Sequence, residues 1–360
     1  MFSIIYPYRN RDIQRVKNSL ESLEKQTNKN FKIYFVNYGS DKRYTEELEG
    51  LLLNYSSVKY SYLYTEQQPW NKSKAINSVL RNLDSGYFFV ADIDMIFHLS
   101  FIEKALQLLK DNEVYYFQVG FLSEAESKTA KRFEDYNIKF KSNEWATGLT
   151  MCPVEAAKAI GGFDEFYHFW GSEDTDFHVR LKNTGKSVNF YSKETLMLHQ
   201  WHETYRNKEI KTLNRLLQVS GIVQFNHFYL KKVIQERRTV VNNENFGNIQ
   251  SKKDYEKLIG YEKNNTELIS NKQVEIDYFL FKKLPHLESG LHAFKISEAV
   301  DKSIKTIIKS ILNKNKTRYY SLKTINDKLL FHIINYYSNC HYNYCIAEDL
   351  KSIKLVINKL

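Results

Sequence analysis

The sequence contains little cysteine, proline or glycine. Its 360 residues include three cysteines, four prolines and thirteen glycines. Cys152, Cys340 and Cys345 are too few for a disulfide scaffold, and no cysteine–histidine spacing resembles a zinc site. The shortage of proline and glycine predicts long regular elements, and the sparse cysteines fit a reducing, cytoplasmic setting.

Long apolar runs are also missing. No uninterrupted apolar stretch is long enough to cross a bilayer. Residues 1–7 lack the basic leader and apolar core of a signal peptide and predict a strand, so we expect the chain to begin directly with folded structure. Hydrophobic residues make up 42%, aromatic residues 15% and charged residues 26% of the chain. This mixture can bury a core, which excludes disordered, collagen-like and low-complexity proteins.

The excess positive charge lies in the second part of the chain. Residues 1–204 have 25 Lys and Arg against 27 Asp and Glu, whereas residues 205–360 have 27 against 15. This asymmetry predicts two domains with these bounds and with different partners. A basic region rich in Tyr and Phe can bind an anionic membrane, an acidic glycan or nucleic acid, although no nucleic-acid motif is present and we expect no such partner. A solvated lysine-rich face is an equal alternative.

The first 204 residues alternate between strand and helix patterns. Apolar residues recur every three or four positions over 13–23 and 75–83, as in amphipathic helices. The predicted strands are residues 2–6, 31–36, 58–63 and 87–91. This order predicts an α/β domain with a largely parallel sheet. Ligands bind such sheets at the carboxyl ends of the strands.

After residue 204 the pattern changes. Four lysine-rich segments have helical periodicity and strand patterns are few, which predicts a mainly helical C-terminal region. These segments are residues 210–238, 251–262, 296–313 and 319–336.

Two acidic motifs are the first candidates for chemistry. Asp92 and Asp94 directly follow the apolar strand 87–91, where two carboxylates can approach one hard cation. Glu173 and Asp174 open a predicted helix beside Trp170 and Gly171, and aromatic faces next to carboxylates suit a sugar ring. An acidic turn and helix capping are the respective structural alternatives.

Histidine and basic residues follow other strands. His199 and His202 end an apolar run, so either can complete a metal site with Asp94, and a structural role is equally compatible. The stretch 7–11 brings two arginines to the end of the first strand, where they suit a diphosphate or an aromatic base. Residues 70–74 precede the second helix and offer further hydrogen-bond donors for the same ligand.

In their order along residues 2–204, these motifs resemble the GT-A glycosyltransferases. They are closest to the inverting family 2 enzymes and to the β-galactosyltransferase catalytic domain, including relatives that make polysaccharides. The resemblance implies the GT-A fold, an α/β Rossmann-like mixed sheet flanked by helices. It also implies a UDP-sugar donor and Mn²⁺ or Mg²⁺ as cofactor. It does not extend past residue 204.

The resemblance also implies roles for individual residues. The implied donor-binding residues are Pro7, Tyr8, Arg9, Arg11, Asn37, Asn71, Lys72, Asp92, Ile93 and Gly148. Trp145, Trp170 and Gly171 fall in the implied sugar and acceptor pocket, and Asp174 is the implied catalytic base with Glu173 beside it. Asp94, Asp92 and His199 are the implied metal site, with His202 as the alternative to His199. Family 2 enzymes often have a pair of acids where this chain has Asn37. We expect the Asn37 side chain to hydrogen-bond the uracil edge in place of those acids.

The implied reaction is inverting transfer of a hexose or N-acetylhexosamine to a glycan or lipid-linked acceptor in surface polysaccharide synthesis. We expect a cytoplasmic enzyme, peripheral on the inner face of the cell membrane through its basic region. A non-catalytic nucleotide-sugar or glycan-binding protein is the main alternative. A nucleotidyltransferase is the other, but residues 7–11 contain no glycine for a phosphate-binding loop.

Overall fold

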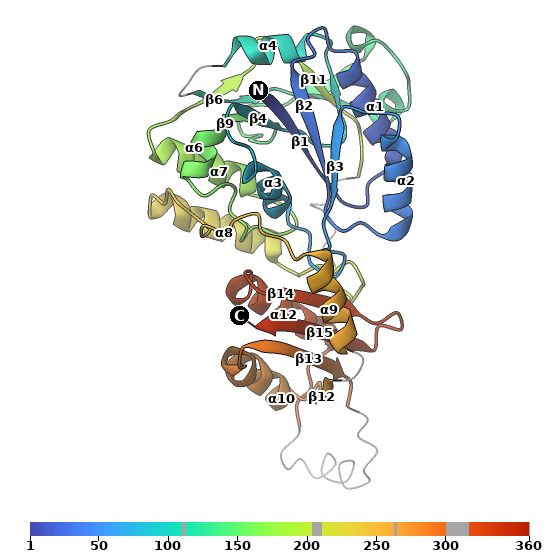
Figure 1. Cartoon of the computed structure of the whole chain (residues 1–360), viewed down its shortest axis with the longest axis vertical. Coiled ribbons are helices and arrows are strands. Elements are labelled where there is room, and N and C mark those ends of the chain that lie inside the picture. Colours follow the sequence, from blue (N-terminus) through green and yellow to red (C-terminus); the bar gives the residue numbers. More distant parts are fainter. Residues whose placement is uncertain (110–112, 204–210, 263–264, 300–316, 360) are drawn as a thin grey trace. The chain divides into compact units, whose positions relative to one another are not determined.

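The computed structural model describes residues 1–109, 113–203, 211–262, 265–299 and 317–359. These residues form two compact units that interleave along the chain (Figure 1). The first unit consists of Met1–Glu66, Trp70–Asn207 and Val223–Asn248, and the second of Gln67–Pro69, Lys208–Ile222 and Ile249–Leu360.

A seven-stranded sheet forms the centre of the first unit. Its order is β10-β6-β9-β4-β1-β2-β3, and β9 alone runs antiparallel to its neighbours among these strands. The strands are β1 (Phe2–Tyr8), β2 (Phe31–Asn37), β3 (Val58–Tyr62), β4 (Tyr87–Val90), β6 (Glu113–Phe117), β9 (Thr150–Pro153) and β10 (Ser187–Tyr191). Every residue of β1 is buried, because β1 lies inside the sheet with helices on both faces. The predicted mixed sheet flanked by helices is confirmed.

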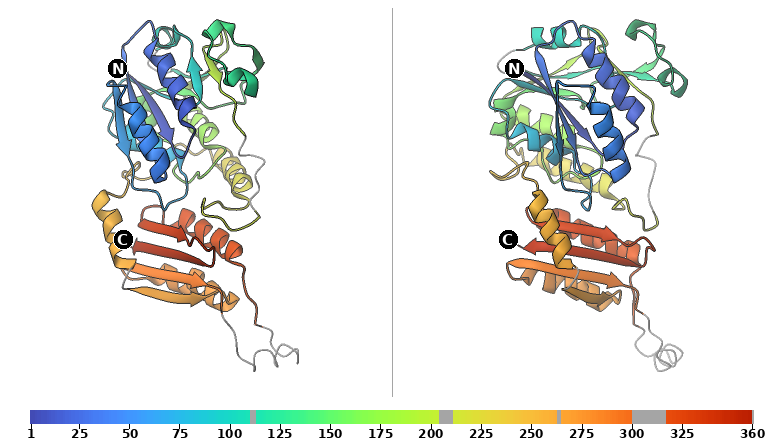
Figure 2. Two further views of the ribbon diagram at one scale, coloured as in Figure 1. Left: turned by 90° about the vertical axis from the view of Figure 1, so that its right-hand side faces the viewer. Right: turned by 45° about the vertical axis from the view of Figure 1, so that its right-hand side comes forward.

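Helices cover both faces of this sheet (Figure 2). The helices of the first unit are α1 (Ile13–Glu24), α2 (Lys42–Leu52), α3 (Lys72–Leu80), α4 (Phe101–Gln107), α5 (Glu124–Ser127), α6 (Val154–Ala159), α7 (Glu173–Asn183) and α8 (Ile222–Gln235). Helix α1 confirms the helix predicted from the apolar residues of 13–23: Val16, Leu20 and Leu23 lie on one stripe and are buried. Asp12 caps its N-terminus by accepting a hydrogen bond from the Arg15 backbone N–H.

A second, smaller sheet of the first unit has the order β5-β11-β7-β8. Its strands are β5 (Met95–Phe97), β7 (Gly120–Leu122), β8 (Ile138–Lys141) and β11 (Met197–His199). Strand β11 runs antiparallel to β5 with His199 opposite Met95. This register brings the histidine beside Asp94, although the two residues are far apart in the chain.

The second unit is built on a sheet, so the prediction of a mainly helical C-terminal region is wrong. Its order is β12-β13-β15-β14, from β12 (Thr266–Ser270), β13 (Gly290–Ser297), β14 (His341–Ile346) and β15 (Ser352–Lys359). Strand β15 is buried on both faces, so its sequence lacks the usual alternation of apolar and polar residues. Lysines also interrupt the apolar residues of β13 and β15.

Helices in this part of the chain were better predicted. Helix α8 and the second-unit helices α9 (Lys252–Glu262) and α12 (Leu322–Tyr336) confirm three of the four predicted segments. Of the fourth, 296–313, the first residues end β13 and residues 300–313 lie outside the described residues. Among the helices in the described part of the chain, none combines the length and apolarity needed to span a membrane.

Candidate active site

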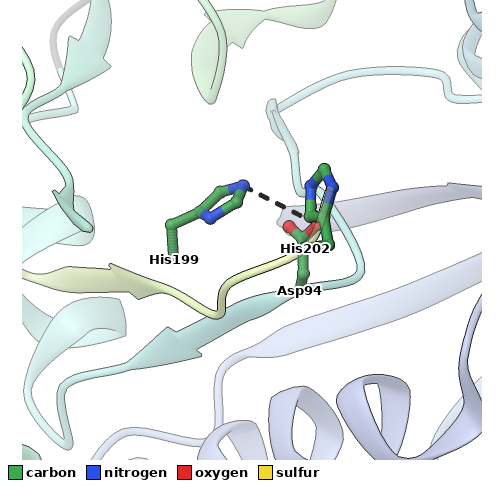
Figure 3. Close-up of side chains that lie close together, drawn as sticks. All are labelled: Asp94, His199 and His202. Carbon is green, nitrogen blue, oxygen red and sulfur yellow. Dashed lines mark ion pairs between the residues drawn. The ribbon is translucent and has the colours of Figure 1, made fainter. Parts of the chain in front are cut away.

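Three side chains that could hold a metal ion, the candidate metal-binding group, meet at the edge of the smaller sheet. Asp94 precedes β5, His199 ends β11, and His202 follows it, with both imidazoles directed toward the carboxylate (Figure 3). His202 Nε2 lies 3.1 Å and His199 Nε2 3.7 Å from Asp94 Oδ2. One ligand atom from each residue lies within 4.8 Å of the other two. The structure therefore brings both candidate histidines to Asp94, not one in place of the other.

The chemistry of this group fits a divalent metal ion. The second carboxylate oxygen, Asp94 Oδ1, is buried and has no hydrogen-bond partner among the described residues, which is costly unless a cation is bound. Burial alone would raise the pKa of Asp94, but His199 and His202 outweigh it and lower this pKa to about 2. Burial lowers the pKa of His199, so this ring is neutral and can donate a lone pair at neutral pH. Two imidazoles with one carboxylate favour a transition-metal ion over Mg²⁺.

A second cluster joins the two acidic motifs through Lys72. This lysine begins α3, and its Nζ lies 3.3 Å from Asp92 Oδ1, 3.4 Å from Asp174 Oδ2 and 3.8 Å from Glu173 Oε1. Since Asp92 is two residues from Asp94, the lysine cluster and the metal-binding group are neighbours. The structure thus brings together the residues after β4, at the start of α3 and at the start of α7.

Asp174 has the electrostatic character of a base that works near neutral pH. Burial of its carboxylate raises the pKa, Lys72 opposes this rise, and Glu173 and Asp92 add to it, which gives a pKa of about 7. The same three carboxylates outweigh burial at Lys72 and raise the pKa of its ammonium group. Within the described part of the chain, Asp174 Oδ1 is buried without a hydrogen-bond partner. A Cβ on Gly148 would lie 3.5 Å from Asp174 Oδ2, so the absence of a side chain there leaves room beside the carboxylate.

A strained turn carries Glu173 and Asp174 into this cluster. Phe169, Gly171 and Ser172 all have positive φ angles, of 65°, 103° and 76°. For the two non-glycine residues this conformation costs about 1–3 kcal/mol each, and such strain concentrates at functional sites. Asn226 of α8 holds the turn by donating hydrogen bonds to the backbone carbonyls of His168 and Trp170.

A buried ion pair fixes α7 from behind. Arg180 is completely buried and donates to the Asp176 carboxylate and to the carbonyls of Ile160 and Gly162. Tyr167 adds a hydroxyl hydrogen bond to Asp176. Asp176 follows Glu173 and Asp174 in α7, and these bonds join it to the turn at Gly161 and Gly162. Asp176 therefore supports the structure and does not line the Lys72 cluster.

The residues predicted to bind the nucleotide lie along the ends of β1 and β2. Arg9 donates to the Glu66 carbonyl, and its guanidinium lies 5.9 Å from the centre of the Tyr38 ring. Arg11 is exposed, and the Tyr8 hydroxyl donates to its carbonyl. Pro7, inside β1, pairs with Val36 of β2.

Two of the predicted donor-binding side chains are engaged within the protein. The amide of Asn37 is buried, donates to Thr45 and Tyr60, and accepts from the Ser40 backbone N–H. These hydrogen bonds hold the turn after β2 in place. Asn71 caps α3 by accepting from the Lys74 backbone N–H, and it donates to the Glu165 carbonyl. Their roles in donor binding stay predictions.

The remaining predicted residues differ in exposure. Ile93 is buried in the core between the two aspartates, and Trp170 is half-buried in the strained turn. Trp145 is 82% exposed, so its indole is accessible on the surface of the first unit.

Sequence reasoning missed Gln200 and Arg15. Gln200 is buried between α1 and the metal-binding group: its backbone N–H donates to the Asp94 carbonyl, and its side chain donates to the Arg15 carbonyl and accepts from Asn18. Arg15 contributes to lowering the pKa of Asp94. A polar residue between two candidate ligands was the available signal for Gln200. A groove of about 1110 Å³ extends from His202 along α1, lined by Arg15, Asn18 and Trp201 among others.

Part of the chain matches a known family. Residues 128–205 match the sequence profile of a family described as the N-terminal domain of galactosyltransferase. Beta-1,4-galactosyltransferase 5 of Sus scrofa is 24% identical over 145 residues, which are 38% of this chain and 33% of that protein. The chain thus spans about a third of the length of this curated relative. The resemblance to glycosyltransferases that the motifs indicated is confirmed over these residues.

Several solved structures are similar at low sequence identity. A GalNAc-T7 structure with UDP, GalNAc and Mn²⁺ is 14% identical, covers 66% of this chain and 49% of its own, and has a TM-score of 0.49. S. aureus TarS 1-349 in complex with UDP-GlcNAc is 12% identical, covers 96% and 94%, and has a TM-score of 0.46. The mannosyltransferase PcManGT of Pyrobaculum calidifontis, with GDP-Man and Mn²⁺, is 15% identical, covers 55% and 56%, and has a TM-score of 0.40.

Proposed function

We propose that the first unit is a metal-dependent inverting glycosyltransferase that moves a hexose or N-acetylhexosamine from a UDP-sugar to a glycan or lipid-linked acceptor. The observation that carries this proposal is the position of Lys72 between Asp92 and Asp174, next to the group Asp94, His199 and His202. A base and a metal site in adjacent positions are what a displacement at a sugar carbon with a diphosphate leaving group requires. The galactosyltransferase match adds support, because residues 128–205 include Asp174 and His199.

Asp174 is the proposed base. Its carboxylate accepts the proton of the acceptor hydroxyl while that oxygen forms a bond to the anomeric carbon of the donor sugar. The bond from the anomeric carbon to the diphosphate oxygen breaks, and the electron pair leaves with UDP. Lys72 lies 3.4 Å from Asp174 and is placed to stabilise negative charge on both the carboxylate and the departing diphosphate. Glu173 has the same lysine 3.8 Å away and is proposed to orient it.

Asp94, His199 and His202 are the proposed metal ligands, and Asp92 is proposed to face the donor from the Lys72 side. Two imidazoles in the donor set favour Mn²⁺ over Mg²⁺. When bound, such an ion supplies Lewis-acid stabilisation of the diphosphate charge. Gln200 holds the backbone of Asp94 and thereby orients the ligands.

The other predicted residues are assigned to the donor and acceptor by position. Arg9 and Arg11 follow β1, at the carboxyl edge where nucleotides bind in such sheets, and we propose that they hold the nucleotide with Pro7 and Tyr8. Gly148 leaves space for the donor sugar beside Asp174. The two tryptophans Trp145 and Trp170 are proposed to contact sugar rings, together with the Gly171 backbone.

A panel of UDP-sugars tests the proposal. We expect one of UDP-Gal, UDP-GalNAc, UDP-Glc and UDP-GlcNAc to raise the thermal unfolding temperature and to be hydrolysed slowly to UDP, both only with Mn²⁺. Stabilisation without any turnover, with and without added glycans, would favour the non-catalytic binding protein. The absence of both effects for all four donors would refute the assignment.

The basic second part of the chain supports a proposed place of action. We propose that the enzyme works at the inner face of the cell membrane on a lipid-linked acceptor, since residues 205–360 have 27 Lys and Arg against 15 Asp and Glu. Fractionation of cells expressing the full chain tests this. Recovery of the protein in the soluble fraction alone at low salt would contradict it.

A further inference from the structure

One surface of the second unit exposes apolar and aromatic side chains in a continuous group. Helix α10 (Gln273–Tyr278) and the turn that continues it, η3 (Phe279–Lys283), carry Val274, Tyr278 and Phe281 on one face, at spacings of four and three residues. These side chains are 71%, 60% and 64% exposed. The Phe281 ring lies 6.2 Å from the His332 ring of α12, which lies 4.9 Å from Tyr336. We call these five residues the α10–α12 surface.

The opposite face of the same helices is ordinary core. Ile276, Phe279 and Leu280 are buried, and the Phe279 ring lies 4.8 Å from Phe294 of β13. Helix α9 packs on the other side of the sheet, where Leu258 contacts Ala293 (Figure 2). The helices therefore already have their packing partners, and the α10–α12 surface is a second apolar face that their packing in this unit does not use.

Single exposed apolar residues are common, but a contiguous exposed group indicates an interaction site. Tyr336 is 72% exposed, so both helices contribute strongly. Tyrosine and phenylalanine with lysines nearby are typical of surfaces that enter the interface of a bilayer, because the rings occupy the boundary between acyl chains and head groups.

The charges around the surface select the kind of partner. Lys282 is exposed beside Phe281, and Lys283, Lys323 and Lys328 lie on the same elements. Two of these lysines are paired within the unit, Lys283 with Glu267 and Lys323 with Asp327, and Glu275 is paired with Lys272. Positive charge still exceeds negative charge in this part of the chain, where residues 205–360 have 27 Lys and Arg against 15 Asp and Glu, and this excess attracts anionic head groups.

We propose that the α10–α12 surface docks the second unit on an anionic lipid bilayer, with Val274, Tyr278, Phe281 and Tyr336 inserted at the interface. This inference does not depend on the sugar-transfer reaction. It concerns side chains outside the proposed active site.

Vesicle sedimentation with the full chain tests the proposal. The probes are vesicles of phosphatidylcholine alone and of phosphatidylcholine with about one third phosphatidylglycerol. We expect binding to the anionic vesicles, a lower affinity for the neutral ones, and weaker binding at high salt. Loss of both rings in the double variant Tyr278→Ser/Phe281→Ser should lower the vesicle partition coefficient by about tenfold or more.

The matched control is Leu53→Ser, which removes an apolar side chain that is 87% exposed in the first unit. We expect it to bind anionic vesicles like the unaltered chain. Thermal unfolding of each variant checks that the second unit is folded, and Lys282→Glu adds a test of charge with the rings intact. Failure of the unaltered chain to bind anionic vesicles, equal binding to neutral vesicles, or equal partition of the folded double variant and the control would overturn the proposal.

Discussion

Replacing Asp174 by Asn is the most direct test of the proposed mechanism. The substitution keeps the size and the hydrogen-bonding oxygen near Lys72 but removes the ability to accept a proton. A positioned general base contributes about 10²- to 10⁴-fold to a rate, so we expect turnover of the UDP-sugar to fall by at least about 100-fold. Donor binding should be nearly unchanged, since Asp94, His199 and His202 are untouched.

The pH dependence gives a second measure from the same residue. A base with a pKa of about 7 is ionised in roughly one molecule in ten at pH 6 and in roughly nine in ten at pH 8. Because the ionised form is the active one, the rate should be lost as the pH falls through 7, by about tenfold between pH 8 and pH 6. The residual activity of Asp174→Asn should lack this slope.

The assay is UDP release from the donor with saturating Mn²⁺, measured across this pH range for the unaltered chain, Asp174→Asn and Glu173→Gln. Glu173 approaches the same lysine and raises the pKa of Asp174, so its variant should keep the loss of rate on acidification but move it to lower pH. Retention of more than about a tenth of the activity by Asp174→Asn, or a flat profile in the unaltered chain, would show that another group takes the proton.

Other residues give further tests. Asp94→Asn should abolish the rise in unfolding temperature that Mn²⁺ causes, and calorimetry that still detects Mn²⁺ binding would contradict the metal assignment. His199→Ala and His202→Ala should each weaken Mn²⁺ binding by about tenfold or more, because both rings adjoin Asp94, whereas a single-histidine site would leave one variant unaffected. Since the hydrogen bond to Asp94 raises the pKa of His202, protonation should weaken Mn²⁺ binding as the pH falls, which titrations at several pH values would reveal. Arg180→Met leaves Asp176 buried without its cation and should lower the free energy of unfolding by about 3–5 kcal/mol in urea, a value that a change below about 1 kcal/mol would refute.

Most elements from β1 to β4 could be predicted, although α2 was missed, because they depend on local patterns. The apolar stripe of α1 and the buried run of β4 reflect which faces lie against the core, and periodicity records this directly. The second unit shows where periodicity fails. Strand β15 has buried residues on both faces, so its sequence lacks a period of two, and lysines interrupt the apolar residues of β13 and β15.

The sequence by itself determined which residue types were available for chemistry: an acid pair after a buried strand, a second acid pair at a helix start, and histidines after an apolar run. Only the tertiary structure decided how they combine. The antiparallel register of β11 on β5 brings both His199 and His202 to Asp94, and the start of α3 sends Lys72 between Asp92 and Asp174. The physical reason is that strand pairing and helix packing set distances between segments far apart in the chain, whereas local periodicity records only which side of each segment is buried.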